Sequence, residues 1–221
     1  MKENPMGRAE SPQKHKILDA AMHVFADHGL TGATIRMLAR QAGVNSALIY
    51  YYFENKQVLF ADTIRTVLQR FFDSLQSHPQ PFRSGRDRLA FLINGIFDYG
   101  TTHPERLRLI SLAFNLHPGL FGQAVHALIS RQFPYPLKVL REGIAQHQLR
   151  SVHPLQGWWH IIGVCLFSLK LRDVLAHVDV TSTGISLPDP ATQRQVIIET
   201  LVHGLAIKSQ RSNPHARRAH P

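Results

Sequence analysis

Apolar and polar residues between positions 34 and 53 follow a pattern typical of two short helices joined at a glycine. In the first half, the apolar positions follow the spacing i, i+3, i+4 and i+7, which places them on one helix face. These positions are Ile35, Leu38, Ala39 and Ala42. Gly43 is expected to end this helix because glycine adopts the left-handed conformation without steric cost. Ile49 and Phe53 lie four residues apart and predict the inward face of a second helix. The stretch therefore predicts a helix-turn-helix.

The outward side of the second helix carries small and aromatic residues without charge. Thr34 and Asn45 are placed to cap the two helices, so the second helix begins with Ser46 and Ala47. Small residues allow the backbone to approach base edges in a major groove, and tyrosine hydroxyls further along can donate to phosphate oxygens. The alternative is an ordinary pair of core helices with a tyrosine-rich edge. Three consecutive tyrosines at 50–52 cannot all be buried on one helix, so the pattern favours DNA binding.

Residues 17–60 also contain a set of short runs with fixed spacing. These runs are Ile-Leu-Asp-Ala-Ala, Phe-Ala-Asp-His-Gly-Leu, Ala-Thr-Ile-Arg, Ala-Gly-Val and Leu-Ile-Tyr-Tyr-Tyr-Phe-Glu-Asn-Lys. In them the chain resembles the N-terminal domain of TetR-family transcriptional regulators. The resemblance implies a two-domain, all-α homodimer that binds double-stranded DNA, with a C-terminal domain that often binds a small molecule. The positions that it assigns to DNA contact are Thr34, Arg36, Ser46, Ala47, Leu48, Tyr50, Tyr51, Tyr52 and Lys56.

The rest of the chain predicts only helices, so the expected fold class is all-α. A first helix is expected from Pro12 to His28, and a long one is expected to begin near Lys56. Further helices are expected to begin at a Ser84–Asp87 capping pair, at Pro104, after a turn at 117–119, at Pro154 and after Asp189. The helix after 117–119 is expected to run to about His147, with an interruption near Pro134. The expected divisions are a flexible arm (1–13), a DNA-binding domain (14–60), a helical regulatory and dimerisation domain (61–209, with a linker at 179–188) and a flexible basic tail (210–221).

The helix that begins at Pro154 is apolar almost all round. One helix in a domain of this size cannot hide every side against its own chain, so part of its surface is expected to meet a partner. In the family that the chain resembles, the last two helices pair with their copies in a dimer. The expected interface residues are Leu166, Leu169, Ile198, Leu201, Val202 and Leu205.

Aromatic residues recur along the helices of the second half of the chain. Each of them taken alone is best interpreted as core. The family resemblance nevertheless favours a small-molecule site lined by some of them, and an apolar or aromatic ligand, because no buried-looking charge is evident in these helices. The candidate lining residues are Phe71, Phe97, Tyr99, Phe114, Trp159 and Phe167.

The formal net charge of +10 favours a polyanionic partner, but residues 1–60 hold seven basic and five acidic side chains, a net of only +2. The prediction of DNA binding therefore rests on the motif. The single cysteine, Cys165, excludes an intramolecular disulfide and fits a reducing cytosol. No signal peptide is expected, and the most apolar run, 158–171, is too short to span a bilayer, so a soluble cytoplasmic protein is predicted.

Motifs of common catalytic and cofactor-binding sites are absent from the sequence, so no enzyme, cofactor or metal is expected. Fourteen histidines are present, but scattered surface histidine explains them better than a metal site. Cys165 has no lysine or arginine within four residues, which favours a buried thiol over a redox sensor. The family resemblance implies a homodimeric repressor that a ligand releases from a palindromic operator. The alternatives are an activator or constitutive repressor without a ligand and, from another class, a metal-dependent or hydrolytic enzyme.

Overall fold

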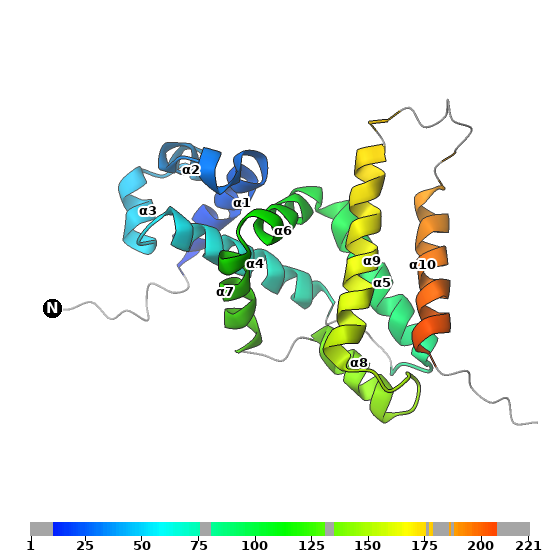
Figure 1. Ribbon diagram of the computed structural model, residues 1–221. Helices are drawn as coiled ribbons and strands as arrows, with labels where there is room; N and C mark the ends of the chain where they lie inside the picture. The colour runs from blue at the N-terminus through cyan, green and yellow to red at the C-terminus, as the bar shows by residue number, and fades with distance from the viewer. Residues whose placement is uncertain are drawn as a thin grey trace, which may run out of the picture. The chain divides into compact units, whose positions relative to one another are not determined.

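The computed structural model describes residues 11–75, 81–130, 135–175, 177–178, 186 and 188–206. The described residues form ten α-helices and no strand, which confirms the expected all-α fold (Figure 1). An isolated antiparallel bridge joins Leu149 and Ala206. The chain divides into two compact units, the first formed by residues 1–78 and 97–135 and the second by 79–96 and 136–221. The boundary lies within α5 (Gly85–Thr102), so this helix contributes to both units.

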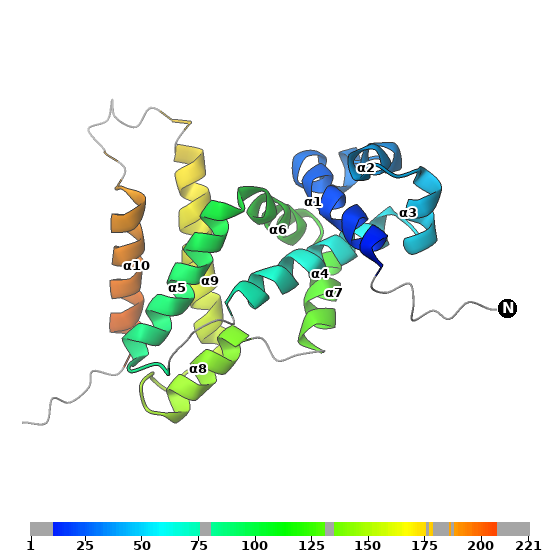
Figure 2. The same ribbon diagram turned by 180° about the vertical axis from the view of Figure 1, so that it is seen from behind.

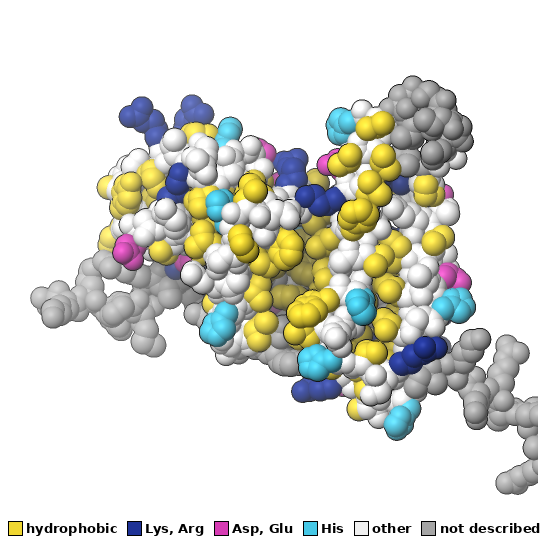
Figure 3. All heavy atoms as spheres, in the orientation of Figure 1, with side chains coloured by type: hydrophobic (Ala, Val, Ile, Leu, Met, Phe, Trp, Pro, Cys, Tyr) yellow, Lys and Arg dark blue, Asp and Glu magenta, His cyan; other side chains and the backbone are white. Residues whose placement is uncertain are grey.

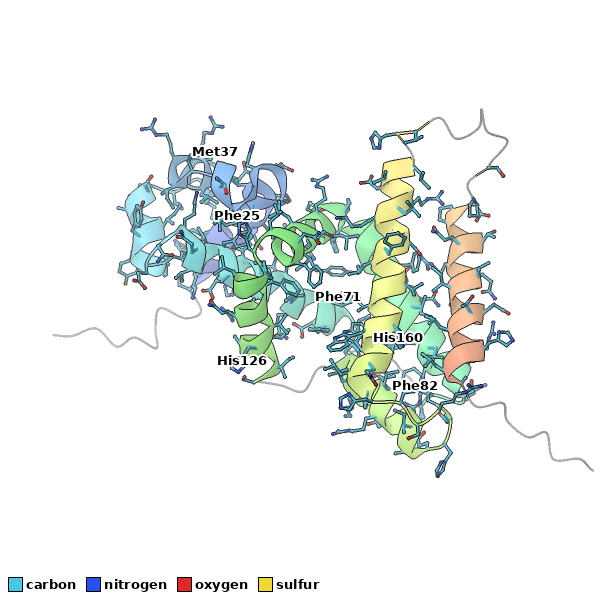
Figure 4. All side chains as sticks on the ribbon, viewed as in Figure 1. Phe25, Met37, Phe71, Phe82, His126 and His160 are labelled. Atoms are coloured by element: carbon cyan, nitrogen blue, oxygen red, sulfur yellow. The ribbon has the colours of Figure 1, made fainter. Side chains whose placement is uncertain are left out.

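The first unit is organised around α4, which contacts α1, α6 and α7. Its helices are α1 (Pro12–Gly32), α2 (Ile35–Ala42), α3 (Ser46–Tyr52), α4 (Lys56–Ser74), α6 (Pro104–Leu116) and α7 (Pro118–Ile129). In its core, the ring of Phe25 on α1, labelled in Figure 4, meets the ring of Phe60 on α4 edge to face, with centroids 5.0 Å apart. Because α4 is part of this core, the first unit extends beyond residue 60, where the expected DNA-binding domain ends.

Side-chain caps define the helix ends around the helix-turn-helix. The Met37 amide donates to Thr34 Oγ1 (3.2 Å) and the Leu48 amide to Asn45 Oδ1 (2.8 Å), which confirms both predicted caps. The Val58 amide donates to Asn55 Oδ1 at 2.9 Å, which fixes the start of α4. Gly43 ends α2 with φ of 60°, in the left-handed region that favours glycine. The local turn chemistry that the sequence predicts is therefore present.

The end of α1 differs from the expectation of a stop at Gly29. Gly29 leaves helical geometry (φ 65°, ψ 179°), but helical turns resume after it and reach Gly32. The Ala33 amide closes this last turn by donating to the Gly29 carbonyl at 3.2 Å, and Leu30 is buried within it. The added turn carries the chain into the core before α2 begins.

The second unit contains the first part of α5, nearly all of α8 (Tyr135–Ala145), α9 (Pro154–Leu175) and α10 (Pro190–Leu205). α9 and α10 contact each other and lie side by side in both ribbon views (Figures 1 and 2). The predicted caps are again present, because Asp87 N donates to Ser84 Oγ (3.1 Å) and Thr192 N donates to Asp189 Oδ1 (3.0 Å). The apolar residues that recur at helical spacing along α5 are buried: Leu89, Leu92, Ile93, Ile96 and Phe97.

A buried arginine holds the end of α8 in the second unit. Arg88 is 2% exposed, and its guanidinium donates to the Gln148 Oε1 (2.7 Å), the Gln146 Oε1 (2.6 Å) and the Val139 carbonyl (3.2 Å). These acceptors replace the water that the charge loses on burial. The expectation that these helices hold no buried charge is therefore wrong.

One expected boundary in the second half differs in the structure. Only His117 lies outside a helix at the predicted turn 117–119, because Pro118 suits the first position of α7. The helix expected after this turn, with an interruption near Pro134, corresponds to α7 and α8, which lie on either side of residues 131–134, outside the described residues. Residues 1–10 of the expected arm, most of the 179–188 linker and the 210–221 tail also lie outside them.

Candidate DNA-binding site and regulatory surfaces

α3 is anchored on one side and open on the other. Ile49 is 1% exposed and packs into the core of the first unit. Ser46 and Ala47 at the start of the helix are exposed, and Tyr50 and Tyr51 are 57% and 46% exposed. The seven-residue helix therefore presents small residues at its start and two phenol rings further along, as a helix that enters a major groove requires.

The other predicted DNA contacts divide into exposed and half-buried residues. Thr34 and Arg36 are exposed at the start of α2. Leu48 is half-buried and packs against the core, so the outward position expected for it is only partly available. Tyr52 is also half-buried, and its hydroxyl forms a 2.7 Å hydrogen bond with Ser11 Oγ. The predicted contacts of α3 that are exposed are therefore Ser46, Ala47, Tyr50 and Tyr51.

Lys56 has partners within its own chain. Its ammonium donates to the Ala33 carbonyl at 2.7 Å and lies 3.5 Å from the Thr31 carbonyl. The contact ties the first residue of α4 to the turn that precedes α2. A phosphate contact by Lys56 stays a prediction, since the structure gives its ammonium another acceptor.

Sequence reasoning missed Arg40, an exposed cation in the last turn of α2. The outward positions of a helix repeat every three to four residues, so the spacing of four between Arg36 and Arg40 predicts that both lie on the same face. Lys16 is also exposed and lies over the turn between α2 and α3. Its Nζ would be 3.4 Å from a Cβ atom added at Gly43. Lys14 is instead engaged with Asp62 at 3.6 Å and with the Phe53 ring. The exposed cations accordingly lie on α2 and the start of α1.

The six aromatic residues predicted for a ligand site are divided between the two units, with four in the first unit and two in the second. Phe71, labelled in Figure 4, projects from the last turns of α4. Its ring meets that of Tyr99 edge-on, with centroids 5.1 Å apart. Phe97 is buried (2% exposed), whereas Phe114 on α6 is 62% exposed. Trp159 and Phe167, on α9 of the second unit, are 59% and 67% exposed. Among the six, Phe71 and Tyr99 form a ring contact.

A polar group accompanies this aromatic pair. The Tyr99 hydroxyl donates to the Val67 carbonyl (3.3 Å) and accepts from Arg106 Nη1 (3.3 Å). Burial raises the pKa of Tyr99 above its ordinary value, although the hydrogen bond and charge of Arg106 oppose the shift. The His103 ring also meets that of Tyr99 edge to face, with ring centroids 5.0 Å apart. Sequence reasoning missed both Arg106 and His103.

α9 has an open apolar stripe. Val164, Phe167, Leu171 and Val174 are 40–67% exposed and follow one another at intervals of three, four and three residues. Hydrophobic side chains gather along α9 in the space-filling view (Figure 3). The residues predicted for the dimer interface are more enclosed: Ile198 is buried, and Leu166, Leu169, Leu201, Val202 and Leu205 are half-buried. The exposed stripe lies on α9, the helix that also carries Leu166 and Leu169.

Other chemistry finds little support in the described part of the chain. No group of three histidine, cysteine, aspartate or glutamate side chains there is arranged to hold a metal ion. Cys165 is fully buried, and desolvation raises the pKa of its thiol to about 12. Within the described ranges, no helix combines the length and apolar character that crossing a membrane requires.

Comparison with known proteins agrees with this geometry. The family model for bacterial regulatory proteins, tetR family, matches residues 17–63. The HTH-type transcriptional repressor NicS of Pseudomonas putida is 32% identical over 167 residues, which make up 74% of this chain and 78% of NicS. The HTH-type transcriptional repressor SCO4008 of Streptomyces coelicolor is 37% identical over 97 residues, which cover 44% of this chain and only 47% of that protein. The solved structure of the transcriptional regulator FadR of Bacillus subtilis, in complex with stearoyl-CoA, is similar in fold, with a TM-score of 0.70 at 19% identity over 86% of this chain and 98% of that chain.

Proposed function

The chain belongs to the TetR family of bacterial regulatory proteins, and from that membership we propose that it is a homodimeric repressor that a small organic effector releases from a palindromic operator. Members of this family are transcriptional regulators, so the chain is a regulator and not an enzyme. The observation that carries the proposal is the exposure of α3. Ile49 anchors one side of this helix in the core, and its first residues, Ser46 and Ala47, are exposed to solvent.

The DNA contacts in this proposal come from α2 and α3. Ser46 and Ala47 approach base edges, where the Ala47 methyl group meets a thymine methyl. Tyr50 and Tyr51 donate to phosphate oxygens, and Arg36 supplies charge that the α3 surface lacks. Because few of these groups read bases by hydrogen bonds, operator choice depends partly on DNA shape.

The open stripe on α9 supports the homodimer. Its three-four-three spacing is that of the apolar seam along which two helices pack side by side. A large apolar surface of this kind is unfavourable in water, and covering a leucine or phenylalanine contributes roughly 1.5–3 kcal/mol when burial is complete. A twofold axis at this stripe would pair α9 and α10 with their copies and give two recognition helices. Such a dimer reads half-sites about one helical turn apart, or a multiple of that spacing.

The effector arm of the proposal rests on α4. This helix begins at Lys56, which holds the turn before α2, and its later turns carry Phe71. A ligand that contacts the later turns can therefore shift the helix that positions the DNA-reading residues. FadR, similar in fold, was solved with stearoyl-CoA, which supports a site for an organic molecule in this fold. The effector relieves repression by favouring a conformation whose two heads no longer fit their half-sites together.

The test is an operator titration with the full-length protein. DNA enriched by the protein from a random-sequence pool serves as the operator, and affinity is measured by fluorescence anisotropy with and without a compound that raises the melting temperature. A coupling of about 1–3 kcal/mol predicts a 5–150-fold loss of operator affinity, and operator DNA must weaken compound binding by the same factor. If compounds that bind tightly leave operator affinity unchanged, a constitutive repressor or an activator replaces the proposal.

A further inference from the structure

Arg106 is enclosed in the first unit without enough hydrogen-bond partners. Its side chain is 18% exposed. Its Nε is buried, and no hydrogen-bond acceptor reaches it. The hydrogen bond that the described structure gives the guanidinium joins Nη1 to the Tyr99 hydroxyl at 3.3 Å, longer than usual. A guanidinium has five N–H groups to satisfy, so this arginine is poorly solvated by its own protein.

The contrast with Arg88 shows that this arrangement is unusual within the same chain. Arg88 is more deeply buried, but its guanidinium donates three hydrogen bonds of 2.6–3.2 Å to two glutamine side chains and a backbone carbonyl. Arg88 is therefore satisfied as a structural residue. A buried charged donor without an acceptor is unfavourable, and the contacts of Arg106 with Tyr99 and Glu105 leave its Nε in that state.

Glu105 is the only carboxylate near Arg106 in the described contacts, and it does not satisfy the arginine. Its Oε1 lies 3.7 Å from Arg106 Nε and 3.8 Å from His103 Nδ1, which is beyond hydrogen-bond length in both cases. The glutamate thus neutralises part of the local charge without forming the two parallel N–H···O bonds that a carboxylate and a guanidinium prefer.

Aromatic side chains extend from this arginine in a continuous row. The rings of Phe72, Phe71, Tyr99 and His103 follow one another with centroids 5.4, 5.1 and 5.0 Å apart. Phe71, Phe72 and Tyr99 are half-buried, so the row still has apolar surface to offer. The cluster therefore combines an apolar row with a cation at one end, the complement of an amphipathic acid.

We propose that Arg106 receives the carboxylate of the effector, and that the effector is an organic acid whose apolar body lies along the Phe72–Phe71–Tyr99 row. This inference rests on the proposed function, whose effector it assigns to a chemical class. The ligand carboxylate bonds to Arg106 through the Nε that lacks an acceptor, and Glu105 swings aside because both carboxylates compete for one cation. The proposal adds an acidic group to the apolar or aromatic ligand expected from the sequence, because that expectation rested on the lack of an evident buried charge in these helices.

The experiment measures binding to the full-length dimer in the absence of DNA. The probes are two aromatic acids, benzoate and phenylacetate, and two aliphatic acids, octanoate and decanoate, each compared with its primary amide by calorimetric titration. At least one acid is expected to bind, and its amide to bind about ten- to a hundredfold more weakly, because the amide loses a charge-assisted pair. The aromatic and aliphatic arms identify the shape of the apolar body.

Two substitutions with opposite expected effects test the role of Arg106. Arg106→Gln should weaken acid binding about ten- to a hundredfold, and Glu105→Gln should strengthen it, because Glu105→Gln removes the competing carboxylate. Arg108→Gln is the matched control on the same helix, since Arg108 is exposed and pairs with Asp27 at 3.1 Å. Arg108→Gln is expected to leave acid binding unchanged. If Arg106 had only a structural role, Arg106→Gln and Glu105→Gln would not change the affinity for the acid in opposite directions.

A ligand-free measurement provides a second test. Arg106→Met keeps the packing of the side-chain stem and removes the unsatisfied charge, so it should raise the melting temperature of the free protein by a few degrees. Arg108→Met should change it little. Acids and amides that bind equally, a panel in which no acid binds, or a large fall in melting temperature for Arg106→Met would overturn the inference. Acid binding through Arg106 that leaves operator affinity unchanged would instead count against the proposed function alone.

Discussion

Replacing Lys56 by methionine separates two roles for this residue, a brace within the protein and a contact to DNA phosphate. The ammonium donates to the Ala33 carbonyl at 2.7 Å, and Ala33 is completely buried. Lys56→Met keeps most of the aliphatic stem and removes this charge-assisted bond. The contact with the Thr31 carbonyl, at 3.5 Å, is too long to add much. The structure therefore predicts a loss of stability that comes from one hydrogen bond.

The expected loss is about 1.5–3 kcal/mol, the range for hydrogen bonds that involve a charged group. For a chain of this size, each kcal/mol lowers the melting temperature by about 2–4 °C, so Lys56→Met should melt about 3–12 °C below wild type. Differential scanning calorimetry measures the shift. Arg36→Gln is the control, because Arg36 is exposed and should change the melting temperature little.

DNA binding at several salt concentrations decides between the two roles. The slope of log affinity against log salt falls by about 0.9 for each phosphate that the protein no longer neutralises, so a dimer that neutralises two fewer phosphates changes its slope by about 1.8. A brace predicts that Lys56→Met weakens binding by the same factor at every salt concentration, whereas Arg36→Gln reduces the slope. An unchanged melting temperature together with a slope reduced by about 1.8 would refute the brace.

Three further predictions address assembly, the turn and the buried thiol. Phe167→Glu should convert the dimer to a monomer, as measured by sedimentation velocity. Phe114→Glu, which changes a similarly exposed phenylalanine on α6, should leave the dimer intact. A monomeric wild type would contradict the proposed interface. Gly43→Ala should destabilise the protein by about 1–2 kcal/mol in urea unfolding, because φ is 60° there, and an unchanged midpoint would show that the turn accepts a side chain. Burial raises the pKa of Cys165 from 9.0 to about 12, so the buried neutral thiol should contribute its full share of the unfolding free energy below pH 9, and that contribution should fall as the pH rises further. At pH 8 a thiol reagent should label Cys165 only when the protein unfolds.

Features that depend on neighbouring residues could be predicted from the sequence. The caps at Thr34 and Asn45 and the left-handed Gly43 involve atoms within three or four residues of one another. The buried face of α5 is also predictable from the sequence, because Leu89, Leu92 and Ile93 recur at helical spacing. These local signals define the helix-turn-helix and most of the all-α fold.

Features that depend on distant residues could not be predicted in this way. α9 is apolar on nearly every side, so its sequence has no periodicity to show which side is covered. The sequence therefore favours Leu166 and Leu169 for the interface, although the more exposed residues are Val164 and Phe167. The partners that bury Arg88 lie 51 to 60 positions away along the chain, which no local pattern reveals. Charge in the interior of both units was missed for this reason.

The most direct test of the account is a footprint of the protein on its enriched operator, compared between wild type and Ala47→Asp. Ala47 is exposed at the start of α3, so an aspartate there would face the DNA backbone with like charge while leaving the core of the first unit untouched. The account predicts that wild type protects a palindrome with half-sites about one helical turn apart, or a multiple of it, and that Ala47→Asp melts normally but protects nothing. Protection of a single asymmetric site, or an unchanged footprint with Ala47→Asp, would contradict the assignment of α3 as the recognition helix.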